Sequence, residues 1–292
     1  MAGSPLLSDA VLAICLGLFS AVTLAAANMS VKMGGDILLS RAILSAFAAA
    51  IVLPFAFIVP PPDAATWRAF AFAVPAHFFY QICMIKALQR GDLSLVFPVM
   101  RGAAPLLTAF TALLFLGETL APLSWIGLVL ATGAVAVFAL PPQGRGLREH
   151  PHAGALLWAA GTAVGIALYN VTDAHGVRVA PSAFTFIVWL FLLDPIAVIL
   201  LALLLRRRVL RSALAMRWRY GAAGGALSIL SFGSALYAFS LIETAKVSAL
   251  RETSVVIAAL MGTFFLGEGL GRRRIAAAVV LAGGLVLMQF GG

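Results

Sequence analysis

The sequence predicts an all-α membrane protein in which ten transmembrane helices form two inverted five-helix repeats around a central cavity. Three observations predict it. The chain of 292 residues is 62% hydrophobic and only 11% charged, whereas soluble domains carry about a quarter of their residues as charge. It contains a series of separate apolar stretches, and a segment of its first half recurs in its second half. A soluble globular fold is thereby excluded.

The apolar stretches account for most of the chain. An α-helix needs roughly 20 apolar residues to cross a bilayer. We expect ten spans, at approximately 10–31, 37–59, 67–88, 93–116, 121–140, 153–174, 182–205, 220–241, 245–266 and 274–290. The first span is expected to be retained, because no basic flank precedes it and Lys32 follows it. Ten crossings use roughly 200 residues, which leaves no room for a separate catalytic domain.

Basic residues are distributed unevenly between the gaps that separate the spans. The 20 Lys and Arg residues exceed the 11 Asp and Glu residues, for a formal charge of +9. One set of alternate gaps holds 15 basic residues, and the other set holds only Arg68, Arg178 and Lys246. Because basic residues near helix ends are retained in the cytoplasm, the first set is predicted to be cytoplasmic. Both termini are then expected outside.

An internal repeat explains why the two halves should be inverted. Residues 115–119 (Phe-Leu-Gly-Glu-Thr) recur as 265–269 (Phe-Leu-Gly-Glu-Gly), and the same offset places Arg101 onto Arg251. Because five is an odd number of crossings, the second repeat must enter the membrane from the opposite side. Inverted repeats create a substrate site where the two copies meet near mid-membrane, and this architecture underlies many alternating-access transporters. The expected boundaries are 1–140 for the first repeat, 141–152 for the linker and 153–292 for the second repeat.

Several segments of the repeats also resemble a known family. The residues that carry the resemblance are 91–96, Pro98, 105–107 and 116–118 in the first half, and 249–254 and 266–268 in the second. By these segments the chain resembles the EamA-type members of the drug/metabolite transporter (DMT) superfamily. The resemblance covers nearly the whole chain. Within that family it is most similar to the YddG-type exporters of aromatic amino acids. The resemblance implies a ten-helix inner-membrane exporter with a cavity lined by both repeats.

Two polar and aromatic stripes are candidates for lining a substrate cavity. His77, Tyr80 and Met84 fall on one face of the third span. Trp158 and Tyr169 fall on one face of the sixth span, although aromatic residues at span ends also serve as interface anchors. We expect these five residues to contact substrate.

The eighth span contributes small residues and hydroxyl groups. Ser228 and Ser231 share a face with small neighbours, and Tyr237 adds a hydroxyl on an adjacent face. Small residues let helices pack closely, which is the structural interpretation. They also leave room for a ligand, and a wall of small residues opposite aromatic rings would suit a phenyl or indole group. We include the three residues in the predicted substrate site.

Arg101 and Arg251 lie within spans, where an arginine is costly and faces protein, water or a partner. Two interpretations are open: contact with a substrate carboxylate, or a structural role. Glu252 follows Arg251 directly and offers it an internal ion pair, whereas Arg101 has no adjacent acid.

Acidic residues fall into two groups. Asp194, beside Pro195 in the middle of the seventh span, either takes up a proton during transport or hydrogen-bonds the backbone freed by the proline. Glu118 and Glu268 stand where a span ends and a short loop begins. For these two we expect a capping role rather than a paired carboxylate site.

Sequence signatures of catalysis and metal binding are absent. The chain has no His-Glu-x-x-His, Gly-x-Ser-x-Gly, P-loop or glycine-rich dinucleotide turn, and its histidines lack metal-ligand spacing. We therefore predict no catalytic residue, no metal, no cofactor and no nucleic-acid partner.

The predicted function is export of small metabolites, with aromatic or other neutral amino acids as the first choice of substrate. The predicted location is a bacterial-type inner (plasma) membrane, in which the protein is a monomer. One alternative is a broad-specificity exporter of drugs or nucleosides. An alternative of another class is an intramembrane enzyme that uses Asp194 and His77.

Overall fold

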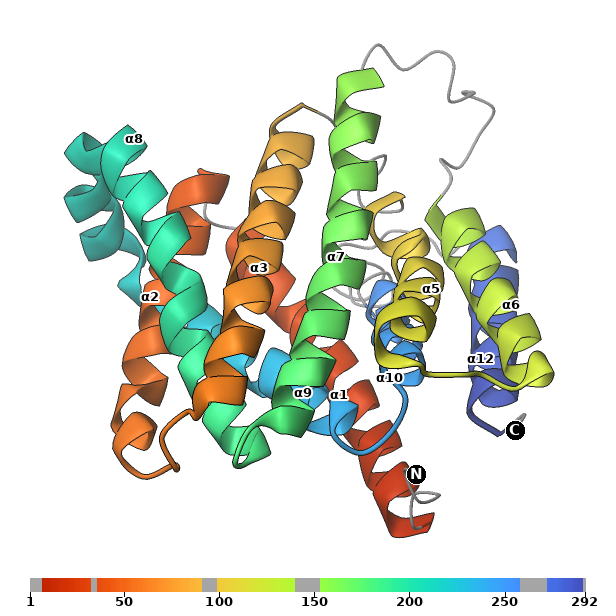
Figure 1. Cartoon of the computed structure of the whole chain (residues 1–292). Coiled ribbons are helices and arrows are strands. Elements are labelled where there is room, and N and C mark those ends of the chain that lie inside the picture. The colour runs from red at the N-terminus through yellow and green to blue at the C-terminus, as the bar shows by residue number, and fades with distance from the viewer. Residues whose placement is uncertain (1–6, 33–35, 91–98, 140–152, 258–271, 291–292) are drawn as a thin grey trace. The chain divides into compact units, whose positions relative to one another are not determined.

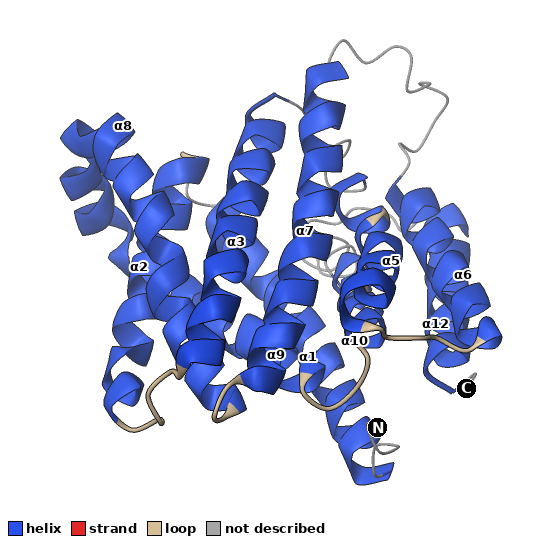
Figure 2. Cartoon of the chain, viewed as in Figure 1, coloured by secondary structure: helices blue, strands red, loops and turns tan. Residues whose placement is uncertain are grey.

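The computed structural model describes residues 7–32, 36–90, 99–139, 153–257 and 272–290. Within these ranges the regular elements are helices and none is a strand (Figure 1, Figure 2). The expected linker 141–152, the segment 91–98, and Glu268 with the end of the ninth span lie outside the described residues. The α-helices are α1 (Leu7–Lys32), α2 (Ile37–Val52), α3 (Ala64–Arg90), α5 (Ala104–Leu116), α6 (Pro122–Ala139), α7 (Ala153–Val179), α8 (Ala183–Ser228), α9 (Ser234–Phe239), α10 (Thr244–Arg251) and α12 (Arg272–Phe290).

Most of the predicted spans coincide with an apolar helix. Two shorter apolar helices, Pro122–Val137 and Ile275–Phe290, fall on the fifth and tenth spans, and α10 falls on the ninth. Seven helices of the described ranges are long and apolar enough to cross a membrane: Asp9–Ala27, Ile37–Phe57, Ala64–Arg90, Val99–Leu116, Gly154–Val179, Ala183–Arg206 and Ser212–Phe239.

The arginine-rich segment 206–219 lies where a gap is expected between the seventh and eighth spans, and the apolar helix is interrupted there, into Ala183–Arg206 and Ser212–Phe239. The chain is helical through this segment as part of α8, and it departs from helical dihedral angles at Arg206 (φ −133°, ψ 16°). Hydropathy detects where polar residues interrupt an apolar run, but arginine is a good helix former. The interruption therefore marks a helix break at one residue rather than an irregular loop. Beyond α8, a π-helix, η3 (Ile229–Gly233), leads into α9.

The helices form two compact units that differ from the two sequence repeats. Unit 1 comprises Met1–Phe78 and Thr172–Ile242, and unit 2 comprises Phe79–Val171 and Glu243–Gly292. Each unit therefore combines helices from both halves of the sequence. Helices α3 and α7 each contribute residues to both units.

In unit 1, α2 packs closely against α8. A Cβ atom added to Gly225 would lie 2.9 Å from the Ala48 nitrogen and 3.0 Å from the Leu44 oxygen. Such close backbone approach is typical of membrane helices that meet at small residues. The Ser231 hydroxyl donates a hydrogen bond to the Ser20 carbonyl (2.9 Å) and joins η3 to α1.

In unit 2, α6 and α12 run side by side (Figure 1). The Ser124 hydroxyl donates to the Met288 carbonyl (2.9 Å), and the backbones approach closely at Gly127 and Gly284. Adding 150 to the bounds of α6 gives 272–289, and α12 is Arg272–Phe290. The sequence offset thus relates two helices that pack together. Their shared core includes Leu128, Val135, Leu281, Leu285 and Met288.

Two neighbouring glycines of α12 allow a matched test of this contact. A Cβ atom at Gly284 would lie 2.8 Å from both Ala131 N and Gly127 O, whereas one at Gly283 would meet nothing within 4 Å. We expect Gly284→Ala to destabilise the protein by about 1–3 kcal/mol through overpacking. Gly283→Ala should instead be neutral or stabilising by up to about 1 kcal/mol, because alanine favours a helix. Thermal unfolding of both variants in detergent measures the difference, and equal melting temperatures would contradict the close contact.

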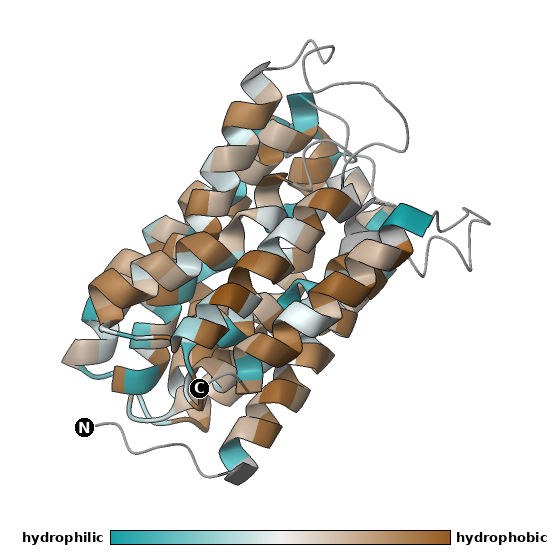
Figure 3. Ribbon diagram, turned by 90° about the vertical axis from the view of Figure 1, so that its right-hand side faces the viewer, coloured by the Kyte–Doolittle hydropathy of each residue, from teal (hydrophilic) through white to brown (hydrophobic). Residues whose placement is uncertain are grey.

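Apolar residues occupy much of the length of the helices (Figure 3), and many large apolar side chains are exposed. Phe57, Phe72 and Leu204 are 86%, 71% and 79% exposed. Soluble proteins rarely expose large contiguous apolar patches, whereas helices that satisfy their own backbone hydrogen bonds can present such side chains to lipid. The surface therefore fits a bilayer environment.

Candidate functional site

Unit 2 contains a buried cluster of charged residues, here called the arginine cluster, made of Arg101, Arg251 and Glu252. Arg101 lies in the helical turn that precedes α5, Arg251 is the last residue of α10, and Glu252 follows it. The three residues are 8%, 4% and 2% exposed. The two arginines that the offset of 150 residues relates therefore lie in one cluster.

The carboxylate of Glu252 binds Arg101 with both oxygens. Arg101 Nε donates to Glu252 Oε2 (3.2 Å), and Arg101 Nη2 lies 3.1 Å from Glu252 Oε1. Arg101 Nη2 also donates to the backbone carbonyl of Arg251 (3.3 Å). Glu252 therefore contacts Arg101, which is distant in sequence, and it also attracts its neighbour Arg251 electrostatically.

The arginine cluster holds two guanidinium groups and one carboxylate. Glu252 forms an ion pair with Arg101 and also attracts Arg251 electrostatically, so one carboxylate lies between two buried guanidinium groups. A buried charge is expensive unless an opposite charge or hydrogen bonds compensate it. The cluster therefore has the electrostatic character of an anion-binding site.

An aromatic pair lies in the same unit. The rings of Tyr80 and Tyr169 meet edge to face with centroids 5.0 Å apart, and the Tyr80 hydroxyl donates to Met84 Sδ (3.2 Å). Gly165 makes room for Tyr80, because a Cβ there would lie 2.8 Å from the Tyr80 Cα. Both tyrosines are within electrostatic range of Arg101 and Arg251. Tyr80 and Tyr169, which were predicted from separate spans, are thus both near the arginine cluster.

Trp158 occupies a different environment in unit 2. Its ring lies 5.7 Å from the guanidinium carbon of Arg90. Together with Met84 it packs against a small core formed by Ala87, Met100, Ala155 and Ala159. A tryptophan beside an arginine near a helix end has the character of an interface anchor.

Asn170 is a polar residue that the sequence analysis did not single out. It is 1% exposed, and its Nδ2 donates to Thr108 Oγ1 and Ser248 Oγ, each at 3.1 Å. Its Oδ1 is buried and accepts no hydrogen bond from the described residues. Its position next to Tyr169 within a predicted span was the available signal.

Unit 1 contains a second buried polar group, here called the histidine cluster, made of His77, Asp173 and Asp194. The His77 Nε2 atom lies 2.8 Å from Asp173 Oδ2, and His77 Nδ1 lies 3.8 Å from Asp194 Oδ1. The side chains of His77 and Asp173 are 7% and 0% exposed, and that of Asp194 is 17% exposed. His77 and Asp194, which were predicted for different roles, thus lie in one cluster. The imidazole of His77 faces both Asp194 and Asp173.

The serines and tyrosine predicted from the eighth span lie in unit 1. Ser231 is buried in the π-helix and hydrogen-bonded to Ser20, as described above, and Ser228 is half-buried. Tyr237 on α9 is half-buried and packs against Phe184, with ring centroids 5.5 Å apart. These contacts tie η3 and α9 to α1 and α8.

Glu118 has the capping role that was expected. Its Oε2 accepts a hydrogen bond from the Thr244 backbone nitrogen (2.8 Å), and its Oε1 accepts one from the Thr244 hydroxyl (2.8 Å). Thr244 is the first residue of α10, so the carboxylate satisfies a donor at a helix N-terminus. The prediction for Glu118 is confirmed.

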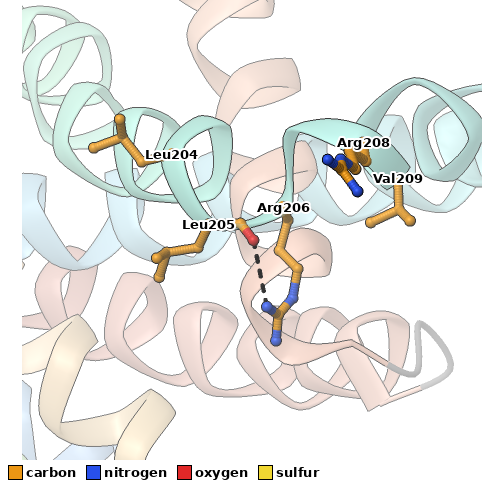
Figure 4. A pocket seen from close by; sticks show the side chains of 5 residues that line it. All are labelled: Leu204, Leu205, Arg206, Arg208 and Val209. Carbon is orange, nitrogen blue, oxygen red and sulfur yellow. Dashed lines mark hydrogen bonds between the residues drawn. The ribbon is translucent and has the colours of Figure 1, made fainter.

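A hollow of about 420 Å³ lies at the break in α8 and is lined by Leu204, Leu205, Arg206, Arg208 and Val209 (Figure 4). Arg206 Nε donates to Asp36 Oδ2 (3.1 Å). Burial acts to raise the pKa of Asp36, but the amides of Leu39 and Leu38 and the Arg206 guanidinium outweigh it and hold that pKa below its ordinary value. Basic residues of this kind suit contact with anionic lipid headgroups.

Comparison with known proteins assigns the fold and the family. A model of the EamA-like transporter family matches residues 8–140 and again residues 153–290. The chain belongs to the EamA-like transporter family. A search of curated proteins returns no match. Among 29 matching chains of solved structures, one crystal structure covers 98% of this chain and 99% of its own, with a TM-score of 0.76 and 18% sequence identity. At that identity the likeness shows the fold alone.

Family membership makes the chain a multi-pass membrane transporter of small molecules. The apolar helices and the lipid-suited surface agree with it. EamA-like transporters are in general not enzymes, which leaves the intramembrane enzyme without support from the family.

Proposed function

We propose that this EamA-like transporter exports aromatic or other bulky neutral amino acids across a bacterial-type inner membrane. The observation that carries the proposal is the arginine cluster, in which two buried guanidinium groups share one carboxylate beside a pair of tyrosines. No covalent change of the substrate is involved.

The substrate carboxylate would bind at Arg251. Arg251 is a second buried guanidinium group in a cluster that holds one carboxylate, so a substrate carboxylate would add a further favourable ion pair there. Arginine is well suited to this, because its planar fork of donors matches a carboxylate. A ligand without a carboxylate would not form this ion pair.

The rest of an amino acid could be recognised by neighbouring residues. The edge-to-face geometry of Tyr80 and Tyr169 offers aromatic surface, and aromatic contacts add about 0.5–1.5 kcal/mol beyond area burial. Asn170 Oδ1 is an acceptor suited to an ammonium group. The aromatic exporters within the family, which the sequence resembles, favour this substrate class over drugs or nucleosides.

The transport cycle we propose is alternating access by a monomer. Residues 1–140 and 153–292 would be inverted repeats of five helices each around a central cavity, with both termini outside. Support comes from the odd number of spans per repeat, from the basic residues of alternate gaps, and from the two family matches. Rocking of inverted repeats about a shared site is the common mechanism of such carriers.

Counterflow into proteoliposomes tests the substrate class. Vesicles loaded with unlabelled phenylalanine should accumulate labelled phenylalanine, and external tryptophan should compete with it. A cationic dye and a nucleoside should compete at least tenfold more weakly, a difference of about 1.4 kcal/mol. Equal competition by the dye or the nucleoside would instead support a broad-specificity exporter. Empty vesicles serve as the control for leakage.

A further inference from the structure

We propose that the histidine cluster is a proton-binding site that couples substrate export to proton movement in the opposite direction. The proton would bind to the His77 imidazole between Asp173 and Asp194 when the site is open to the outside, and would leave from the same nitrogen when it is open to the inside. The inference rests on the proposed export function for its direction. Its site, however, is separate from the arginine cluster.

The first argument is the hydrogen-bonding capacity of the imidazole. Each ring nitrogen of His77 faces a carboxylate oxygen, at 2.8 Å for Asp173 and 3.8 Å for Asp194. An ionised carboxylate only accepts hydrogen bonds, and a neutral imidazole donates with one nitrogen alone. The 2.8 Å contact with Asp173 is within hydrogen-bond distance, and Asp194 at 3.8 Å is close enough to attract a ring that carries a proton on both nitrogens. The geometry therefore accommodates one exchangeable proton.

The second argument is the charge balance of the surroundings. Among the described residues, the charged groups that act on His77 include Asp173 on α7, Asp194 on α8 and Arg41 on α2. The ring of Phe232 in η3 meets the imidazole edge to face, with centroids 5.4 Å apart. A proton on His77 adds a positive charge beside two acidic side chains in a buried site, so protonation and the local arrangement of helices are energetically linked.

The third argument concerns how the proton could influence transport. His77 lies three residues before Tyr80 on α3, and Asp173 lies four residues after Tyr169 on α7. A change in the His77–Asp173 interaction therefore acts on the same two helices that carry the tyrosine pair, about one turn away. An ion pair with a purely structural role could lie anywhere along the two helices and need not lie one turn from the tyrosine pair. Ionisable residues within membrane helices commonly form proton relays in transporters.

The proton site can be observed without any substrate. In reconstituted protein labelled at histidine ring nitrogens, the His77 signal is identified by its loss in His77→Gln. We expect the His77 ring to change protonation state across the physiological pH range, and the pH of that change to move in Asp194→Asn. A single protonation state across the whole range would overturn the proposal. His175, an exposed histidine of α7, provides an internal reference.

Coupling is tested with labelled phenylalanine in the same vesicles. A pH gradient should drive phenylalanine accumulation by the wild type, and phenylalanine flux should change the internal pH reported by a trapped dye. In Asp173→Asn, the ratio of gradient-driven accumulation to counterflow should fall at least tenfold. Equal loss of both would show a structural role and overturn the proposal, as would wild-type counterflow that ignores the gradient. Absence of counterflow in the wild type would instead contradict the proposed substrate, while the histidine titration still decides the proton site.

Discussion

Replacing Glu252 with glutamine should destabilise the protein by about 3–5 kcal/mol, the range found when one partner of a buried ion pair is removed. The side chain of Glu252 is 3% exposed and that of Arg101 is 10% exposed. Without the carboxylate, two guanidinium groups would lie buried together with no negative charge of the cluster to balance them. The variant should unfold at a much lower temperature in detergent, and its yield from membranes should fall.

A double variant separates the ion pair from the packing around it. Replacing a complete buried pair with apolar side chains of similar volume is often neutral or stabilising. Arg101→Met combined with Glu252→Met should therefore be markedly more stable than Glu252→Gln alone, although it carries one more substitution. A double variant that is less stable than Glu252→Gln would show that the pair contributes more than charge balance.

Replacing Arg251 with glutamine should lower phenylalanine counterflow roughly 100-fold, which corresponds to about 3 kcal/mol, within the range for truncating one side of a buried charge pair. The Arg101–Glu252 ion pair remains in this variant, so the fold should keep most of its stability. A functional site that costs stability is common in proteins. A purely structural Arg251 predicts the reverse, with a lower melting temperature and little change in substrate affinity among the folded molecules.

Arg178 provides a matched control for this substitution. Its guanidinium donates to the carbonyls of Phe239 (2.9 Å) and Ile242 (3.1 Å) in unit 1, which is a structural arrangement at the end of α9. Arg178→Gln should lower the melting temperature and leave the concentration dependence of counterflow unchanged. A loss of substrate affinity in Arg178→Gln as large as in Arg251→Gln would remove the specific role of Arg251.

The sequence predicts the helices well because lipid imposes one strong constraint. Each span must be apolar and long enough to satisfy its own backbone, and the bounds of α6 and α12 follow the predicted fifth and tenth spans closely. The interruption between the seventh and eighth spans is present, since Ala183–Arg206 and Ser212–Phe239 are separate apolar spans, but hydropathy could not show that the backbone between them is helical except at Arg206. The two compact units were also not predictable, since they join residues far apart in the chain.

Residues of the candidate site could be predicted only where the residue type is unusual at its position in or beside a span. Arg101 and Arg251 stood out because arginine is rare within spans, and Glu118 because it follows a span directly. The ion pair between Glu252 and Arg101 could not be read from the chain, because the two residues are distant in sequence. The partners of Asp173 and Asn170 could not be read either, because His77 and the hydroxyls of Thr108 and Ser248 come from other helices.

The central claim is that the arginine cluster recognises a substrate carboxylate, and replacing that carboxylate tests it most directly. Phenylalanine and phenylalaninamide, which differ only at this group, are compared as competitors of labelled phenylalanine counterflow. The amide should compete at least tenfold more weakly with the wild type, or about 1.4 kcal/mol, and this preference should disappear in Arg251→Gln. Equal competition by the amide and the acid in the wild type would contradict the account.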